Sequence, residues 1–212
     1  MLHFETIEPS TLELLKRLQA LPSLAETRLV GGTALALQLG HRTSVDLDIF
    51  GKWDYAEDLA AVLSKAGRVE KESGLPDGKM AFFYINDVKV DCVSYDMYRW
   101  LDPAVEDAGV RLAGIRDIAA MKINAVTNRG TRKDFVDVAR LLDDHSLEEM
   151  FGWYCMKYPE ANPALALRSL SYFADAETMP MPRMLVPFDW ESAKDRICAA
   201  VRELALGGGK RI

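Results

Sequence analysis

The sequence predicts an α+β fold: a small mixed β-sheet core with helices, followed by a C-terminal helical region. Two observations lead to this prediction. Up to about residue 115, short stretches with the two-residue alternation of strands are interspersed with stretches of helical spacing. From Ile115 onward, only the helical spacing continues. We therefore expect a core domain over residues 1–115 and a helical domain over residues 116–212.

The elements of the core domain follow from periodicity and from the residues that begin and end them. Ser10-Thr11-Leu12-Glu13 has the pattern of a capping box, Gly40 suits the end of a short helix, and Asp54-Tyr55-Ala56-Glu57 suits the start of another. Asn86-Asp87 suits a tight turn between two strands. The expected order is helix, strand, helix, strand, helix and three strands, at residues 10–21, 28–30, 34–39, 45–50, 54–67, 68–72, 79–85 and 88–93.

The second half is expected to contain helices only. The apolar spacing from Ile118 to Val126 predicts the first of them, and Asn128-Arg129-Gly130 interrupts the pattern. Thr131-Arg132-Lys133-Asp134 then caps the next helix. The later helices are expected at residues 132–142, 147–157, 161–173 and 191–206, with a linker at residues 179–184.

The composition is that of a folded protein without a membrane span or a secretion signal. Of the 212 residues, 49% are hydrophobic, which is ample for a packed core, but no apolar run approaches the ~20 residues that cross a bilayer. Residues 1–5 lack the basic start and apolar stretch of a signal peptide. The three cysteines and three histidines are scattered and form no zinc pattern. We therefore expect a cytoplasmic protein with reduced thiols.

The negative charge lies in the first part of the chain. The formal net charge is −6; residues 1–115 hold 12 Lys and Arg against 18 Asp and Glu, whereas residues 116–212 hold 14 of each. This balance argues against broad, non-specific binding to nucleic acid. A local basic segment nevertheless occurs at residues 122–140, with five basic and two acidic residues.

Asp46 and Asp48 are two residues apart in an expected strand, so both side chains point to one face while Val45, Leu47 and Ile49 face the core. Two carboxylates this close repel, and one tends to stay protonated unless a cation lies between them. Mg²⁺ commonly binds through one or two carboxylates plus phosphate oxygens. The pair therefore indicates a metal-assisted reaction on a phosphate; a solvated edge strand is the alternative interpretation.

Gly31-Gly32-Thr33 lies between an expected strand end at Val30 and a short helix. Glycines let a ligand approach the backbone closely, and the free N–H groups and dipole at a helix start favour an anion. The turn therefore suits a phosphate held by Gly32 and Thr33 beside the metal site. A tight strand-to-helix turn without a ligand is the alternative interpretation.

Together these motifs resemble the signature of the nucleotidyltransferase superfamily, a Gly-Gly turn followed by an Asp-hydrophobic-Asp-hydrophobic strand. The run from Gly31 through Gly40-His41-Arg42-Thr43-Ser44 to Phe50 resembles one branch more closely, the AbiEii/AbiGii-type toxins of bacterial abortive-infection and toxin–antitoxin systems. Met121-Lys122 and Lys133-Asp134-Phe135-Val136-Asp137 are similar to downstream motifs of that branch. The resemblance spans residues 28–142 and implies that residues 1–115 are a nucleotidyltransferase core domain.

The family pattern implies a third carboxylate on a neighbouring strand. Asp91 is the one carboxylate in the apolar stretch from Val88 to Val93, where it shares a face with Lys89. We expect Asp91 to complete the metal site with Asp46 and Asp48 and to help deprotonate an acceptor hydroxyl. An exposed carboxylate on an open face is the alternative interpretation.

The resemblance also implies positive charge after the sheet. Lys122 and Lys133 are expected as catalytic residues that neutralise triphosphate charge, with Asp134 or Asp137 orienting a lysine or contacting the sugar. A surface ion pair between Lys133 and Asp137, four apart on one helix, is the alternative. Lys157, on a later helix, is expected to be a neutral control position. The expected nucleotide-binding residues are Gly31, Gly32, Thr33, Arg42, Ser44, Arg129, Asp134 and Asp137.

The resemblance implies a metal-dependent nucleotidyltransferase that moves a nucleoside monophosphate from an NTP to a hydroxyl of an RNA, such as a tRNA end, or of a protein. Two Mg²⁺ ions, with Mn²⁺ as a substitute, would lie between the three aspartates. It also implies a cognate antitoxin protein as a partner. Two alternatives stay open: a non-catalytic NTP-binding regulatory module, and a small-molecule nucleotidyltransferase of the antibiotic-modifying kind, which a deep pocket beside Asp91 would favour.

Overall fold

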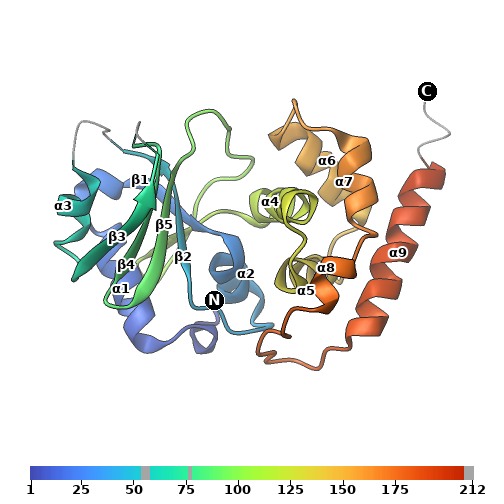
Figure 1. The fold of residues 1–212 in the computed structure, drawn as a ribbon, viewed down its shortest axis with the longest axis horizontal. Helices are drawn as coiled ribbons and strands as arrows, with labels where there is room; N and C mark the ends of the chain where they lie inside the picture. The colour runs from blue at the N-terminus through green and yellow to red at the C-terminus, as the bar shows by residue number, and fades with distance from the viewer. Residues whose placement is uncertain (54–57, 76–77, 208–212) are drawn as a thin grey trace. The chain divides into compact units, whose positions relative to one another are not determined.

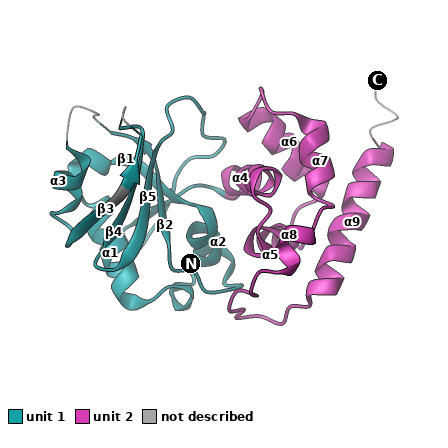
Figure 2. Cartoon of the chain, in the orientation of Figure 1, with its two compact units in different colours: residues 1–114 teal, residues 115–212 magenta. Residues whose placement is uncertain are grey.

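A computed structural model describes residues 1–53, 58–75 and 78–207. The chain divides into two compact units, Met1–Gly114 and Ile115–Ile212 (Figure 2). The first unit contains the sheet and the second unit is helical (Figure 1). The division expected from the sequence differs from this boundary by one residue.

The first unit is built on a seven-stranded mixed sheet with the strand order β3-β4-β5-β2-β1-β7-β6. Strands β2 and β5 are parallel, as are β1 and β7, and the other neighbouring pairs are antiparallel. The predicted mixed sheet is thus confirmed, although β6 and β7 were not predicted. The strands are β1 Glu26–Val30, β2 Leu47–Lys52, β3 Val69–Gly74, β4 Met80–Ile85, β5 Val88–Ser94, β6 Val105–Asp107 and β7 Val110–Leu112.

One face of the sheet is apolar and buried. Leu47 and Ile49 on β2, and Val90 and Cys92 on β5, are fully buried. The residues that alternate with them are only partly buried and include the aspartates of the candidate site. Burial also raises the pKa of the Cys92 thiol to about 12, so this thiol is unreactive at neutral pH.

The segment before β2 departs from the expected strand. The strand begins at Leu47, and Val45 is 61% exposed, so the expectation that Val45 faces the core is wrong. The reason is that side-chain and backbone contacts hold this segment outside the sheet. The backbone N–H of Ser44 donates to the Thr6 carbonyl (2.9 Å), and the Thr33 hydroxyl donates to the Asp46 carbonyl.

The turn between β4 and β5 has the predicted form. Asn86 and Asp87 both have positive φ, 50° and 66°, which is the combination that a type I′ hairpin turn requires. The two residues therefore connect Ile85 to Val88 directly and fix the register that pairs the two strands. This register in turn fixes which face of β5 carries Asp91.

The helices of the first unit pack against the sheet: α1 against β7, α2 against β1 and β2, and α3 against β3. The capping box predicted at Ser10 is wrong, because α1 begins at Pro9 with Glu8 as N-cap; proline has a favourable φ at the first helical position. Gly40 ends α2 with φ +66°, as expected. The elements are η1 Phe4–Thr6, α1 Pro9–Gln19, η2 Pro22–Leu24, α2 Gly31–Leu39 and α3 Leu59–Leu63.

The expected cap at residues 54–57 lies outside the described residues. Helix α3 has Asp58 as its N-cap, and the Asp58 carboxylate accepts hydrogen bonds from the backbone N–H groups of Ala60 (3.0 Å) and Ala61 (3.4 Å). The helix ends at Leu63, four residues before the expected end at Gly67.

The second unit consists of helices that surround α4, which contacts α5, α6 and α7. The helix expected at residues 161–173 is shorter, because it ends at Ser169. Phe173 lies outside it and packs on Phe135 at 4.7 Å between ring centroids. The helices are α4 Ile115–Asn128, α5 Arg132–Leu141, α6 Leu147–Lys157, α7 Pro163–Ser169, α8 Ala174–Glu177 and α9 Trp190–Gly207. Among the described helices, none combines the length and apolar composition needed to cross a membrane.

Candidate functional site

Two of the three predicted carboxylates stand side by side on neighbouring strands. Asp48 on β2 and Asp91 on β5 are direct register partners in a parallel pair, so their side chains project from the same face of the sheet. Asp46 lies immediately before β2, and all three aspartates are partly buried. The strand pairing therefore brings together residues that are 43 positions apart in the sequence.

A lysine to which the sequence interpretation gave no role, Lys89, lies against one of these carboxylates. Lys89 Nζ is 2.7 Å from Asp91 Oδ2. Desolvation lowers the pKa of the Lys89 ammonium, but the hydrogen bond that Lys89 donates to Asp91 and the charges of Asp91, Asp46 and Asp48 raise this pKa above its ordinary value overall. All three carboxylates thus act on one ammonium group. The signal in the sequence was the two-residue spacing of Lys89 and Asp91, which puts both side chains on one face.

The carboxylates of the three aspartates are suitable ligands for a divalent cation, but in the structure the Lys89 ammonium lies against Asp91. Carboxylate oxygens are the ligands that Mg²⁺ prefers. Asp91 Oδ1 is buried and has no hydrogen-bond partner among the residues that the structure describes, and such an oxygen is costly unless a ligand satisfies it. Within the described ranges, no group of three or more His, Cys, Asp or Glu side chains is arranged to hold a metal ion. A site for metal would therefore require the carboxylates to regroup.

The two glycines at the start of α2 are required by their neighbours. Gly31 has φ +70°, and a Cβ there would overlap the Asp48 carboxylate. A Cβ at Gly32 would lie 2.5 Å from Arg42 Nη2. The glycines therefore allow an acidic and a basic side chain to lie directly against the first turn of the helix.

Gly31→Ala should disturb the site more than its backbone strain alone explains. Positive φ costs an alanine about 1–3 kcal/mol, and the added methyl group also displaces Asp48. Gly109→Ala is the matched control, because Gly109 has φ +80° and no heavy atom lies within 4 Å of a Cβ built there. We expect similar losses of unfolding free energy, but a loss of the nucleotidyl transfer that the sequence resemblance implies for Gly31→Ala only. Equal activity of the two variants would contradict this role of Gly31.

Thr33, Ser44 and Arg42 form the support of the Asp46 segment. The Thr33 hydroxyl is buried and hydrogen-bonds Ser44 Oγ (2.8 Å) as well as the Asp46 carbonyl. Arg42 is 2% exposed, and its Nη1 donates to the Thr43 carbonyl (3.0 Å). The side chains of Thr33 and Arg42 are thus internal to the protein, and a phosphate contact from Thr33 would come from its backbone N–H.

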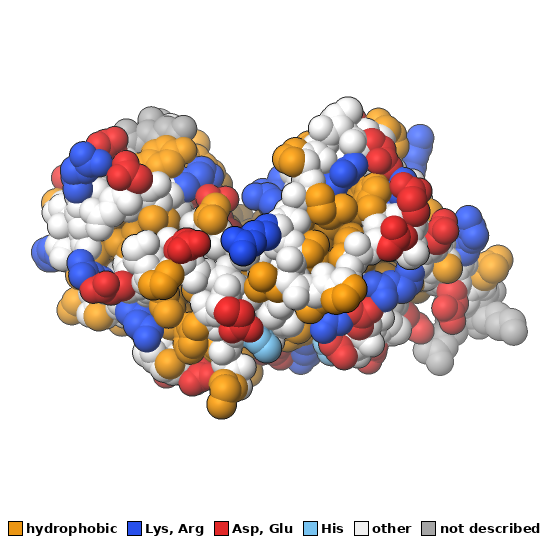
Figure 3. All heavy atoms as spheres, turned by 90° about the horizontal axis from the view of Figure 1, so that it is seen from below, with side chains coloured by type: hydrophobic (Ala, Val, Ile, Leu, Met, Phe, Trp, Pro, Cys, Tyr) orange, Lys and Arg blue, Asp and Glu red, His pale blue; other side chains and the backbone are white. Residues whose placement is uncertain are grey.

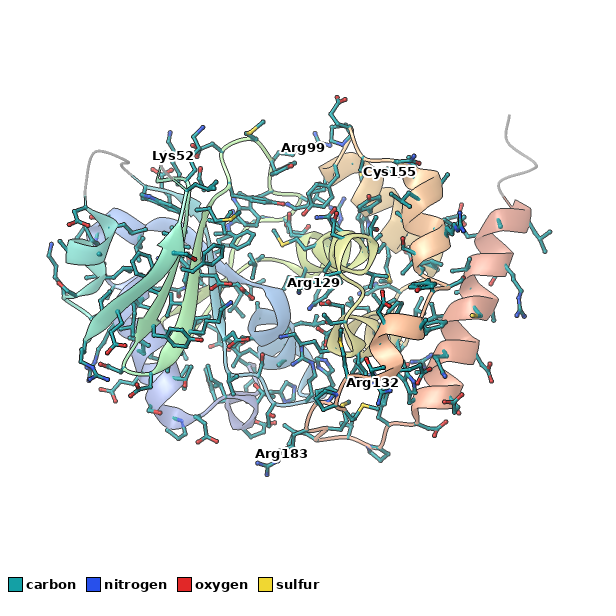
Figure 4. All side chains as sticks on the ribbon, viewed as in Figure 1. Lys52, Arg99, Arg129, Arg132, Cys155 and Arg183 are labelled. Atoms are coloured by element: carbon teal, nitrogen blue, oxygen red, sulfur yellow. The ribbon has the colours of Figure 1, made fainter. Side chains whose placement is uncertain are left out.

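In the second unit, the predicted basic and acidic residues form a buried ion-pair network. Lys122 is 3% exposed, and its Nζ lies 3.1 Å from Asp134 Oδ1 and 2.7 Å from Asp137 Oδ2; both aspartates are fully buried. Arg129, on the turn between α4 and α5 (Figure 4), places its Nε 2.9 Å from Asp134 Oδ2. Thr131 donates to the same oxygen at 2.6 Å. The network therefore fastens α5 to α4.

The network determines the surroundings of Asp134 and Asp137. Burial of Asp134 acts to raise its pKa, but Lys122, Arg129 and Thr131 outweigh this effect and hold the pKa well below its usual range. Asp137 is buried and pairs with Lys122, so the alternative of an exposed surface pair between Lys133 and Asp137 is wrong. Lys133 itself is exposed.

Lys157, expected to be a neutral control position for transfer, is not neutral for the packing of the second unit. Lys157 Nζ lies 2.5 Å from Asp117 Oδ1, and both side chains have no exposed surface. This pair joins α6 to the first turn of α4. Helical periodicity placed Lys157 at the end of a helix, where lysines are commonly solvated, but did not reveal its partner 40 residues away.

The first unit also contains a cavity of about 610 Å³ away from the aspartates. Its lining includes Arg28, Tyr95, Tyr98 and Trp100, and does not include Asp46, Asp48 or Asp91. The Arg28 guanidinium carbon lies 4.4 Å from the centroid of the Trp100 ring. On the face that Figure 3 shows, acidic and basic side chains of each unit are intermingled.

Comparisons with known proteins give three findings. The family model of the nucleotidyl transferase AbiEii toxin, type IV toxin–antitoxin system, matches residues 13–203. An uncharacterized protein of Aquifex aeolicus (strain VF5) is 28% identical over 199 residues, which are 90% of this chain and 94% of that protein. The crystal structure of JHP933 from Helicobacter pylori has a TM-score of 0.54 and 16% identity, covering 95% of this chain and 91% of that chain. At this identity the structural likeness concerns the fold.

Proposed function

Because the chain belongs to the AbiEii family of nucleotidyl transferase toxins of type IV toxin–antitoxin systems, we propose that it transfers a nucleoside monophosphate from an NTP to a hydroxyl group. The acceptor is an RNA, such as a tRNA end, or a protein. A cognate antitoxin protein is its partner, and both act in the cytoplasm.

The observation that supports this proposal most is the pairing of Asp48 with Asp91 beside the first turn of α2. The register of β2 and β5 sets these two carboxylates on one face. Gly31 brings the helix start against Asp48. The N–H groups at the start of α2, a position that favours an anion, and the carboxylates are thus within one small region of the first unit.

Asp46, Asp48 and Asp91 would hold the metal ions, two Mg²⁺ or Mn²⁺. When bound, these ions supply positive charge for the triphosphate and lower the pKa of the acceptor hydroxyl. The N–H groups of Gly32 and Thr33 bind phosphate oxygens. Asp91 accepts the proton of the acceptor hydroxyl, because it is the carboxylate with a buried oxygen that has no hydrogen bond among the described residues. The roles of Lys122 and Lys133 in neutralising the triphosphate stay predictions.

Asp91→Ala should impair the chemical step more than nucleotide binding. Asp46 and Asp48 still hold the metal that arrives with the triphosphate, whereas the group that takes the acceptor proton is lost. We expect turnover to fall by about 100-fold or more, in the range typical of lost general-base catalysis, while the dissociation constant for the NTP changes less than about threefold. Separate measurement of NTP binding and single-turnover rate checks this. A large loss of affinity with an unchanged rate at saturation would contradict the role of Asp91.

The acceptor class follows from digestion of the labelled product. The purified protein is incubated with each α-³²P-labelled NTP, Mg²⁺, and heat-treated cell RNA and protein. Label that ribonuclease removes identifies an RNA acceptor, and label that protease removes identifies a protein acceptor. Label in neither fraction, with Asp48→Asn as the background control, would overturn the proposal.

A further inference from the structure

Lys89, the lysine beside Asp91, is a charged group near the site to which the proposed reaction gives no role. Lys89 lies on β5 two residues before Asp91, so both side chains leave the sheet on the same face. Its ammonium is 2.7 Å from Asp91 Oδ2. The charges of Asp46 and Asp48 act on it as well. The ammonium therefore takes the place of a cation at Asp91, one of the three carboxylates proposed as metal ligands.

We propose that Lys89 is an internal counter-cation that competes with a divalent metal ion for Asp91. Without metal, the ammonium neutralises the carboxylates and holds Asp91. With metal, the ammonium leaves Asp91, and the carboxylate becomes a ligand. Lys89 thus sets the metal concentration at which the site is filled; this role rests on the proposed function only for the choice of Asp46, Asp48 and Asp91 as ligands.

The burial of the two partners favours movement of the lysine. The side chain of Lys89 is 37% exposed, whereas that of Asp91 is 16% exposed. Lysine has a long flexible stem, so its ammonium moves into solvent at little cost. In its present position the Lys89 ammonium also lies 5.8 Å from the centroid of the Phe82 ring, a cation–π contact that does not involve Asp91.

The unsatisfied oxygen of Asp91 indicates that the ion pair is incomplete. Lys89 contacts Oδ2, while Oδ1 is buried and has no hydrogen-bond partner within the described part of the chain. A purely structural ion pair in a partly buried place gains from satisfying both oxygens. A carboxylate that exchanges partners needs an oxygen that its present partner leaves unsatisfied, as Lys89 leaves Oδ1.

The charges predict how a substitution of Lys89 changes the affinity for metal. An ammonium and a divalent ion within about 4 Å of one carboxylate repel each other strongly in a partly buried site. Removing the ammonium charge therefore strengthens metal binding. A lysine that only stabilises the sheet predicts the opposite pattern, a less stable protein with unchanged or weaker metal binding.

The test is Mn²⁺ binding to the nucleotide-free protein, measured by electron paramagnetic resonance of free Mn²⁺. Lys89→Met removes the charge and keeps the stem, and we expect at least about 10-fold tighter binding than wild type. Lys89→Gln, a second neutral variant, should tighten Mn²⁺ binding to a similar extent. Lys89→Arg keeps the charge and should stay within about threefold of wild type. Lys65→Met changes an exposed lysine of the same unit and is the control.

A double-mutant cycle locates the effect at Asp91. In an Asp91→Asn background, Lys89→Met should change Mn²⁺ affinity by less than about threefold, because the carboxylate for which the two cations compete is gone. Wild-type or weaker affinity in both neutral variants would overturn the proposal, and so would absence of Mn²⁺ binding in all proteins. Since no nucleotide is present, failure of the proposed transfer reaction shows separately, as metal binding without transfer.

Discussion

Asp48→Asn should reduce nucleotidyl transfer by about 1000-fold or more while the protein stays folded. Asp48 is the register partner of Asp91 and lies against the start of α2, and we propose it as a ligand of the metal ions. Loss of one group that stabilises transition-state charge commonly costs about 100- to 1000-fold, and the missing ligand adds to this. The side chain is partly exposed and not part of the apolar core, so the unfolding free energy should change little.

The same substitution at Asp87 is the matched control. Asp87 lies in the turn before β5, and its side chain is 88% exposed. Asp87→Asn should retain full transfer activity. Circular dichroism and thermal unfolding verify the fold of both variants. Transfer at the wild-type rate by Asp48→Asn at saturating Mg²⁺ would contradict the assignment of Asp48 as a metal ligand.

Lys157→Ala should destabilise the protein by about 3–5 kcal/mol, because it leaves the buried Asp117 carboxylate without its cation. This is a large part of the stability of a typical domain. Urea unfolding measures the change, and the m-value shows whether the unfolding transition stays the same. Arg168→Ala, at an exposed position of α7, should change the free energy by less than about 0.5 kcal/mol.

A double substitution separates the ion pair from the packing around it. Replacing Lys157 with Met and Asp117 with Leu removes both charges and leaves apolar groups, which is often neutral or stabilising for buried pairs. We expect the double variant to recover most of the stability lost in Lys157→Ala. If Lys157→Ala is as stable as wild type, the Asp117 carboxylate is not held in a buried pair.

Local sequence patterns predicted the elements that form the site. The two-residue alternation of β5 placed Asp91 on the face opposite Val90 and Cys92, and the structure agrees. The Asn86-Asp87 turn fixed the hairpin before it. These patterns succeed because they depend on backbone geometry, which is set by a few neighbouring residues.

Partners distant in the sequence were not predictable in this way. Periodicity shows that a lysine lies on a helix, but not whether an aspartate 12 or 40 residues away is buried beside it, as for Lys122 and Lys157. Lys122 is therefore predicted to act at the triphosphate and Lys157 to be a neutral control, without the buried partner of either being revealed. Val45 shows a second kind of error. The alternation of apolar residues predicted a strand from Val45 onward, but hydrogen bonds to other segments hold the residues before Leu47 outside the sheet.

The most direct test of the central claim compares the α- and γ-phosphates of the NTP. Parallel reactions contain ATP, GTP, CTP or UTP labelled at one of the two positions, Mg²⁺, the purified protein, and heat-treated cell RNA and protein. For at least one NTP, we expect acceptor-bound label from the α-phosphate and none from the γ-phosphate, with both absent for Asp48→Asn. Acceptor-bound γ-label, or no label from any NTP, would contradict nucleotidyl transfer at the Asp46, Asp48 and Asp91 site.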